Sequence, residues 1–158
     1  MRVGPDIYIL DANLLLRLAD ASAADHATAQ VAVKTLRAGG AVLRTIPQAV
    51  FEFWVVATRS RQNNGLGLNV NQAEIFVDYI IRTYWPVPDD PALLTYWRRI
   101  VTQYGVVGKN AHDARYVASM LSHGFIHLLT FDSDFHRYSV EGILVVDPAT
   151  VPSLTRRT

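Results

Sequence analysis

The most constraining stretch of the chain is the segment 7–16, which reads Ile-Tyr-Ile-Leu-Asp-Ala-Asn-Leu-Leu-Leu. Its first four residues are apolar and include β-branched and aromatic side chains, a composition that favours a buried β-strand. The Leu-rich residues behind Asp11 predict the start of a helix. Asp11 therefore stands where a buried strand ends and a helix begins, which is a typical ligand position in open α/β sheets. A helix N-cap is the alternative interpretation, because Asp is a favoured capping residue.

Composition narrows the class of protein. The chain has 158 residues, enough for one domain with an ordinary core, and hydrophobic residues make up 50% of it. Its net charge of +1 does not by itself indicate a nucleic-acid partner. The absence of Cys excludes disulfide scaffolds and thiolate metal sites. Because neither a signal segment nor a membrane-spanning apolar run is apparent, we expect a soluble cytoplasmic protein without a membrane partner.

Short apolar runs alternate with helical patterns along the rest of the chain. After the first strand, further strands are predicted near 41–45, 126–130 and 143–146, with a minor one at 85–88. Helices are predicted over 24–38, 47–61, 71–84, 90–105 and 111–122. This alternation predicts an α/β fold with a mostly parallel sheet of about five strands between helices. We expect a single domain over 1–158, in which 1–6 are a lead-in and 149–158 a C-terminal tail.

Two acids lie inside helical patterns. Glu52 is the one charge in the apolar run 49–57, and burying a carboxylate without compensation costs several kcal/mol. Asp113 begins a helical stripe that continues at Tyr116, which places it on the inward face near the helix start. For Glu52 the alternative is a solvated helix face. For Asp113 it is a first-turn acid in a cap led by Asn110.

A third acid repeats the arrangement of Asp11. Asp132 follows the apolar strand 127–131, and Asp134 lies two residues further on. A loop turn built from Asp-Ser-Asp is the alternative interpretation. Strand carboxyl ends and helix amino ends meet at one edge of a doubly wound sheet, so we expect Asp11, Asp113 and Asp132 to lie together. Glu52, near the start of its helix, can reach the same edge.

Four carboxylates in one pocket would repel one another and take up protons. A divalent cation removes that conflict, and oxygen ligands without Cys indicate Mg²⁺ or Mn²⁺. Such sites commonly serve phosphoryl or phosphodiester chemistry, because the metal lowers the pKa of a bound water and stabilises the leaving oxygen. These residues therefore predict a metal-dependent hydrolase without choosing its substrate.

Four segments, occurring in the same order along the chain, are similar to segments of the PIN-domain nucleases, and most closely of their VapC-type toxins from type II toxin–antitoxin pairs. The segments are Leu10–Leu15, Pro47–Phe53, His112–Ala118 and Leu129–Phe135. Residues 142–148 also resemble the C-terminal end of the family's domain. Order and spacing match over about residues 7–148. The resemblance implies a PIN-like three-layer α/β/α fold.

The same resemblance implies a magnesium-dependent endoribonuclease with Asp11, Glu52, Asp113 and Asp132 as catalytic acids. Asp11 and Asp113 would bind Mg²⁺ directly, with Mn²⁺ as a substitute. Glu52 and Asp132 would complete the shell directly or through water, and Asp134 would be an auxiliary acid. The resemblance also implies an RNA substrate, a homodimer and a cognate antitoxin that blocks the site.

Other functions remain open at this stage. The same acids would serve a metal-dependent phosphatase or DNA nuclease, although Asn13 stands where HAD-type phosphatases carry their second acid. A non-catalytic PIN-fold binding module is a further alternative. We expect His112 to lie on the helix surface, because neighbouring helix residues point to different sides. Several basic residues could contact RNA phosphates, although a solvated face is the simpler interpretation for any one of them: Arg17, Arg59, Arg61, Lys109, Arg115 and Arg137.

Overall fold

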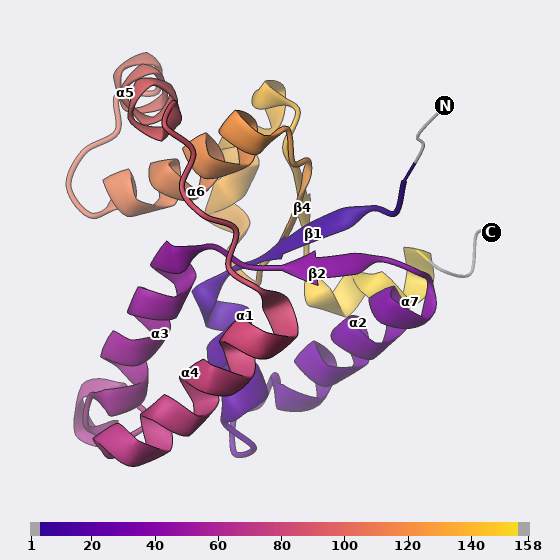
Figure 1. Cartoon of the computed structure of the whole chain (residues 1–158), viewed down its shortest axis with the longest axis vertical. Coiled ribbons are helices and arrows are strands. Elements are labelled where there is room, and N and C mark those ends of the chain that lie inside the picture. The colour runs from indigo at the N-terminus through magenta and orange to yellow at the C-terminus, as the bar shows by residue number, and fades with distance from the viewer. Residues whose placement is uncertain (1–3, 155–158) are drawn as a thin grey trace.

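The computed structural model describes residues 4–154. Its centre is a parallel sheet with the strand order β2-β1-β3-β4 (Figure 1). The strands are β1 (Ile7–Leu10), β2 (Val42–Arg44), β3 (His127–Leu129) and β4 (Leu144–Val146). This confirms the predicted α/β class and the parallel sheet.

The predicted minor strand at 85–88 is wrong in extent. It is reduced to one bridge between Thr45 and Pro86, beyond the end of β2. Proline has no N–H to donate to a neighbouring strand, and a second proline follows at Pro88, so a longer ladder does not form. Within residues 4–154 the sheet therefore has four strands instead of about five.

Helices cover both faces of the sheet. In Figure 1, α1–α4 lie on one side of it, and α5 and α6 lie on the other. The α-helices are α1 (Ala12–Ala19), α2 (His26–Ala38), α3 (Pro47–Thr58), α4 (Val70–Tyr84), α5 (Leu93–Gln103), α6 (Asn110–His123) and α7 (Val151–Leu154). Short 3-10 helices are η1 (Arg61–Asn63), η2 (Ser133–Glu141) and η3 (Pro148–Thr150). The arrangement is the expected three-layer α/β/α fold.

Local sequence signals explain where the main helices begin and end. Pro47 starts α3 in the first helical position, where its missing N–H removes no helical hydrogen bond. Asn69 caps α4 in a reciprocal pair with Gln72. Gly124 ends α6 in the left-handed conformation, with φ at 72°.

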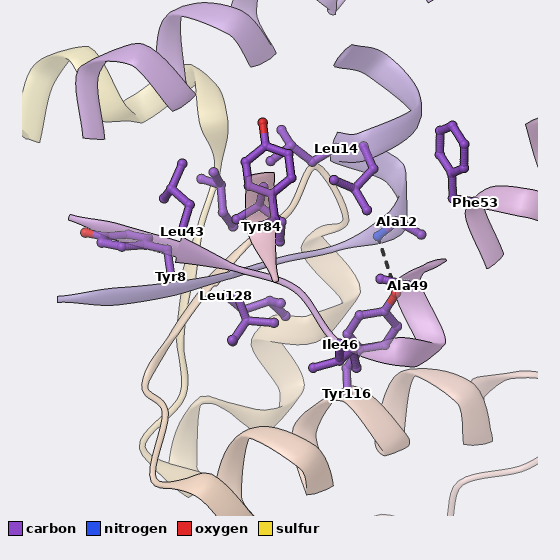
Figure 2. Packing of buried hydrophobic residues seen from close by; sticks show 14 of the residues in the cluster. Tyr8, Ala12, Leu14, Leu43, Ile46, Ala49, Phe53, Tyr84, Tyr116 and Leu128 are labelled. Carbon is purple, nitrogen blue, oxygen red and sulfur yellow. Dashed lines mark hydrogen bonds between the residues drawn. The ribbon is translucent and has the colours of Figure 1, made fainter. Parts of the chain in front are cut away.

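The core joins the sheet to both helical layers. Ile9, Leu10 and Leu128 of the central strands are fully buried. Tyr116 of α6 is also buried, and its hydroxyl accepts a hydrogen bond of 3.3 Å from the backbone N–H of Ala12 (Figure 2). The start of α1 is thereby fastened to a helix from the opposite layer.

Part of the predicted C-terminal tail is folded. Residues 148–154 form η3 and α7, which pack against α2, and Val151 is fully buried. Pro148 and Pro152 do not prevent these helices, because proline is tolerated in the first turn of a helix. Residues 1–3 and 155–158 lie outside the described part of the chain. Among residues 4–154, no helix is both long and apolar enough to span a membrane.

The loop between α3 and α4 requires glycine at position 65. A Cβ placed on Gly65 would overlap the backbone carbonyl of Arg59, and the Gly65 N–H donates to the Ser60 carbonyl at 2.9 Å. We expect Gly65→Ala to lower the free energy of unfolding by about 2 kcal/mol or more, because the backbone must move to admit the methyl group.

Gly39→Ala is the matched control. Gly39 has a φ of −78°, and the nearest atoms to an added Cβ lie at an ordinary 3.5 Å. This substitution should change stability by less than about 1 kcal/mol. Urea denaturation of the two variants tests the difference, and equal losses of stability would contradict the close approach at Gly65.

Candidate metal centre

An acidic cleft of about 760 Å³ opens where β1 and β3 end and where α1 and α6 begin. All four acids predicted to meet line this cleft, namely Asp11, Glu52, Asp113 and Asp132. The structure thus brings together side chains that are far apart in the chain. Asp134 is exposed at the start of η2 and stands outside the lining of the cleft. It is close enough for its charge to help raise the pKa of Asp113.

Asp11 is the most deeply buried of the acids, with 6% of its surface exposed. It occupies the N-cap position of α1, but its side chain makes no capping hydrogen bond, so capping does not explain the residue. Instead, its Oδ2 accepts a hydrogen bond of 2.7 Å from the Thr130 hydroxyl. Burial raises the pKa of Asp11 to about 6, against the lowering effect of the Thr130 bond and with a further increase from the charge of Glu52.

Thr130 connects the ends of the two central strands. Its hydroxyl oxygen accepts hydrogen bonds of 3.0 Å from the Asn13 side-chain amide and from the Asp132 backbone N–H. Asn13 in turn accepts a hydrogen bond of 3.3 Å from the Phe131 N–H. Because Thr130 also donates to Asp11, one hydroxyl sets the relative positions of two acids in the cleft.

Glu52 lies in the second turn of α3 and is held by two neutral donors. Its Oε1 accepts from the Gln48 amide at 2.7 Å, and its Oε2 accepts from the Tyr116 hydroxyl at 3.0 Å. Burial raises the pKa of Tyr116 well above its usual value, and the charges of Asp11 and Glu52 add to that effect. The hydroxyl therefore stays protonated and remains a donor to Glu52.

The surroundings of Glu52 differ from those expected from the sequence. Glu52 is half-buried, while its neighbours Phe51 and Val55 are 65% and 59% exposed. The apolar run 49–57 therefore includes a face that is open to solvent in the isolated chain. The reason is that α3 borders the cleft and is packed only on its other sides, by α1 and α4.

Asp113 lies in the first turn of α6 without serving in a cap. Lys109 occupies the N-cap position, Asn110 is the first helical residue, and no side chain caps the helix. The cap led by Asn110 is therefore wrong as an explanation of Asp113. The pKa of Asp113 is raised to about 6. Burial is the largest cause, and the negative charges of Asp132 and then of Glu52 raise the pKa further.

Asp132 takes part in the predicted turn and in the cleft at once. Its Oδ1 accepts a hydrogen bond of 2.9 Å from the Asp134 N–H, which starts η2. This confirms the Asp-Ser-Asp turn. The same residue still lines the cleft, so the two interpretations of Asp132 do not compete.

The sequence analysis did not predict that His112, Gln48 and Arg115 line the acidic cleft. His112 is exposed on the helix surface, as expected, and it also lines the cleft, because the cleft extends around the first turn of α6. Gln48 and Arg115 also line it. The i, i+4 spacing of Gln48 and Glu52 is a signal that could have indicated their contact.

The charge balance of the cleft favours a bound cation. Within residues 4–154, no Lys or Arg side chain forms an ion pair with any of its four acids. Oxygen-only donors with unpaired charge fit a hard divalent cation such as Mg²⁺ or Mn²⁺. In the same described residues, no group of three or more His, Asp or Glu side chains stands close enough to chelate an ion as placed.

Comparisons with known proteins agree with this fold. The structure is similar to a chain of VapBC2 from Rickettsia felis bound to a DNA fragment from their promoter, with a TM-score of 0.65 and 14% identity over 89% of this chain and 98% of that chain. It is also similar to VapC20 of Mycobacterium tuberculosis, a Sarcin-Ricin loop cleaving toxin, with a TM-score of 0.63 and 18% identity over 87% and 96% of the two chains. VapBC-1 from nontypeable Haemophilus influenzae gives a TM-score of 0.64 and 14% identity over 90% and 98%.

A search of curated protein sequences gave no match. At the low identities of the solved structures, the similarity supports the fold. The family itself follows from the sequence, because the model of the PIN domain matches residues 8–141, which is most of the chain. This chain therefore belongs to the PIN-domain family.

Proposed function

We propose that this protein is a metal-dependent endoribonuclease and the toxin of a toxin–antitoxin pair. The observation that carries the proposal is the meeting of four carboxylates in one cleft where no Lys or Arg of the described chain pairs with them. Membership of the PIN-domain family supports nuclease chemistry, and the Sarcin-Ricin loop cleaving toxin of similar fold supports RNA as the substrate.

Asp11 and Asp113 would hold Mg²⁺ directly, with Mn²⁺ as a substitute, and Glu52 and Asp132 would complete the shell. Asp134 would be an auxiliary acid beside it. The ion, when bound, lowers the pKa of a water and stabilises charge on the leaving oxygen of the phosphodiester.

The protein's own contribution is to hold these acids in place. Thr130 orients the carboxylate of Asp11, while Gln48 and Tyr116 each hold one oxygen of Glu52. A carboxylate oxygen accepts more than one hydrogen bond, so Glu52 can also accept one from the attacking water.

We further propose a cytoplasmic protein that forms a homodimer and binds a cognate antitoxin. Structures of similar fold are described as VapBC complexes, which supports an antitoxin partner. Exposed apolar side chains supply surface for such contacts on α3, at Phe51 and Val55, and on α4, at Ile75 and Tyr79.

Cleavage of RNA tests the nuclease assignment directly. The purified protein should cleave RNA with Mg²⁺ and not with EDTA. Asp11→Asn removes one charge from the cleft but keeps an acceptor for Thr130, and we expect the cleavage rate to fall by about 100-fold or more. Asp78→Asn is the matched control, because the Asp78 side chain is exposed on α4, away from the cleft lining, and pairs with Arg82 at 2.9 Å.

Equal cleavage by the wild type and Asp11→Asn would refute the nuclease assignment. Metal-dependent cleavage of DNA or of phosphomonoesters in place of RNA would favour the alternative enzymes. Binding of a partner without cleavage of any of these substrates would favour the non-catalytic module.

The raised pKa of Asp11 makes a separate prediction about stability. Its folded-state pKa of about 6 lies above the ordinary 3.8, so the ionised side chain destabilises the metal-free protein at neutral pH. Asp11→Asn should therefore raise the free energy of unfolding in EDTA by about 1–3 kcal/mol. The difference from the wild type should shrink as the pH falls through about 6 toward 3.8.

Thermal unfolding with and without Mg²⁺ completes this test. Mg²⁺ should raise the melting temperature of the wild type, because it binds only the folded protein, and should have little effect on Asp11→Asn. Asp78→Asn should respond to Mg²⁺ as the wild type does. An Asp11→Asn variant that is less stable than the wild type in EDTA at neutral pH would contradict the prediction that ionised Asp11 destabilises the metal-free protein.

Induced expression tests the toxin role. We expect expression of the wild type to arrest growth, and expression of Asp11→Asn at the same level to leave growth unchanged. Co-expression of a small gene adjacent to the coding sequence should restore growth if its product is the antitoxin. Normal growth with the wild type expressed and active on RNA would argue against a toxin.

A further inference from the structure

Arg115 is the one Lys or Arg among the residues that line the acidic cleft in the described chain. It lies on α6, two residues after Asp113. Its guanidinium donates through Nη1 to Gln48 Oε1 at 2.9 Å and through Nη2 to Asp89 Oδ2 at 2.6 Å. With 28% of its side chain exposed, Arg115 is held in place and still open to the cleft.

Gln48 sets the position of this guanidinium relative to the acids. Its amide nitrogen donates to Glu52 Oε1 at 2.7 Å and to the His112 carbonyl at 2.9 Å, while its oxygen accepts from Arg115. The side chain is buried, and both of its polar ends are engaged. Arg115 and Glu52 are thus joined through one amide, which places a fixed cation beside the acids without pairing it to them.

Asp89 differs from Gln48 in being an exposed partner. It lies in the connection between α4 and α5, and 40% of its side chain is exposed. An exposed ion pair contributes little net free energy, so another anion can replace it at small cost. The guanidinium carries five N–H donors in a planar fork that suits a phosphate group, and the contacts with Gln48 and Asp89 use two of them.

We propose that Arg115 binds a backbone phosphate of single-stranded RNA in the cleft, and that Asp89 occupies the guanidinium until the RNA displaces it. This rests on the proposed function, because it assigns the contact that holds the strand beside the acids. The cleft, at about 760 Å³, has the size of a small-molecule site, which is room for a short unpaired stretch of the strand.

The two members of the ion pair should act on RNA binding in opposite directions. Binding of a labelled single-stranded RNA is measured by fluorescence anisotropy over a range of salt, with Mg²⁺, in an Asp11→Asn background that prevents cleavage. Adding Arg115→Gln should weaken binding by about tenfold and reduce the slope of log affinity against log salt by about 0.7. Adding Asp89→Asn should tighten binding by about two- to fivefold, because the competing anion is lost.

Arg115→Lys, which keeps the charge but loses the fork, should keep the slope and recover only part of the affinity. Combining Asp89→Asn with Arg115→Gln should give the affinity of Arg115→Gln alone. The exposed pair Asp78 and Arg82 supplies the controls. Asp78→Asn changes the net charge as Asp89→Asn does, and Arg82→Gln changes it as Arg115→Gln does, but both should leave affinity and slope unchanged.

Equal weakening by Asp89→Asn and Arg115→Gln would overturn the proposal, because it would make the pair a purely structural contact. An unchanged salt slope in Arg115→Gln, or equal affinity for a duplex of the same sequence, would overturn it as well. These results are separable from failure of the proposed function, in which the wild type cleaves no RNA at all.

Discussion

The burial of carboxylates in the acidic cleft is the constraint on which the rest of the structure depends. Burial raises the pKa of both Asp11 and Asp113 to about 6, and neighbouring acids add to the rise at both residues, while the hydrogen bond from Thr130 opposes it at Asp11. Such a cluster is stable only if the remaining fold holds it together. The largely buried central strands, with helices packed on both faces, supply the rigidity that keeps these carboxylates at one edge of the sheet.

The partners of the acids explain how charge and position are controlled separately. Thr130, Tyr116 and Gln48 are all neutral donors, so they orient Asp11 and Glu52 without cancelling their charge. The one guanidinium in the lining is directed to Gln48 and Asp89 instead. The acids therefore keep their negative charge for an external cation, which is the arrangement that a hydrolytic metal site needs.

Much of the fold could be predicted because its signals are local. The strand before Asp11, Pro47 at the start of α3 and Gly124 at the end of α6 each act within a few residues. The meeting of the acids was predictable too, because parallel strands place their carboxyl ends together. Bonds between distant residues were not, since the contact of Arg115 with Gln48 spans 67 positions and follows no periodic pattern. The exposure of Phe51 was missed for a related reason, as an apolar run does not show which of its faces is left uncovered.

The two hydrogen bonds of Tyr116 have a consequence for how this protein can vary. One phenol group accepts from the Ala12 N–H inside the core and donates to Glu52 in the cleft. Its ring also packs edge-on against Phe135 at 5.9 Å between centroids. A substitution of Tyr116 therefore alters both the packing of the core and the position of Glu52 in the cleft, so stability and activity cannot be changed independently at this residue.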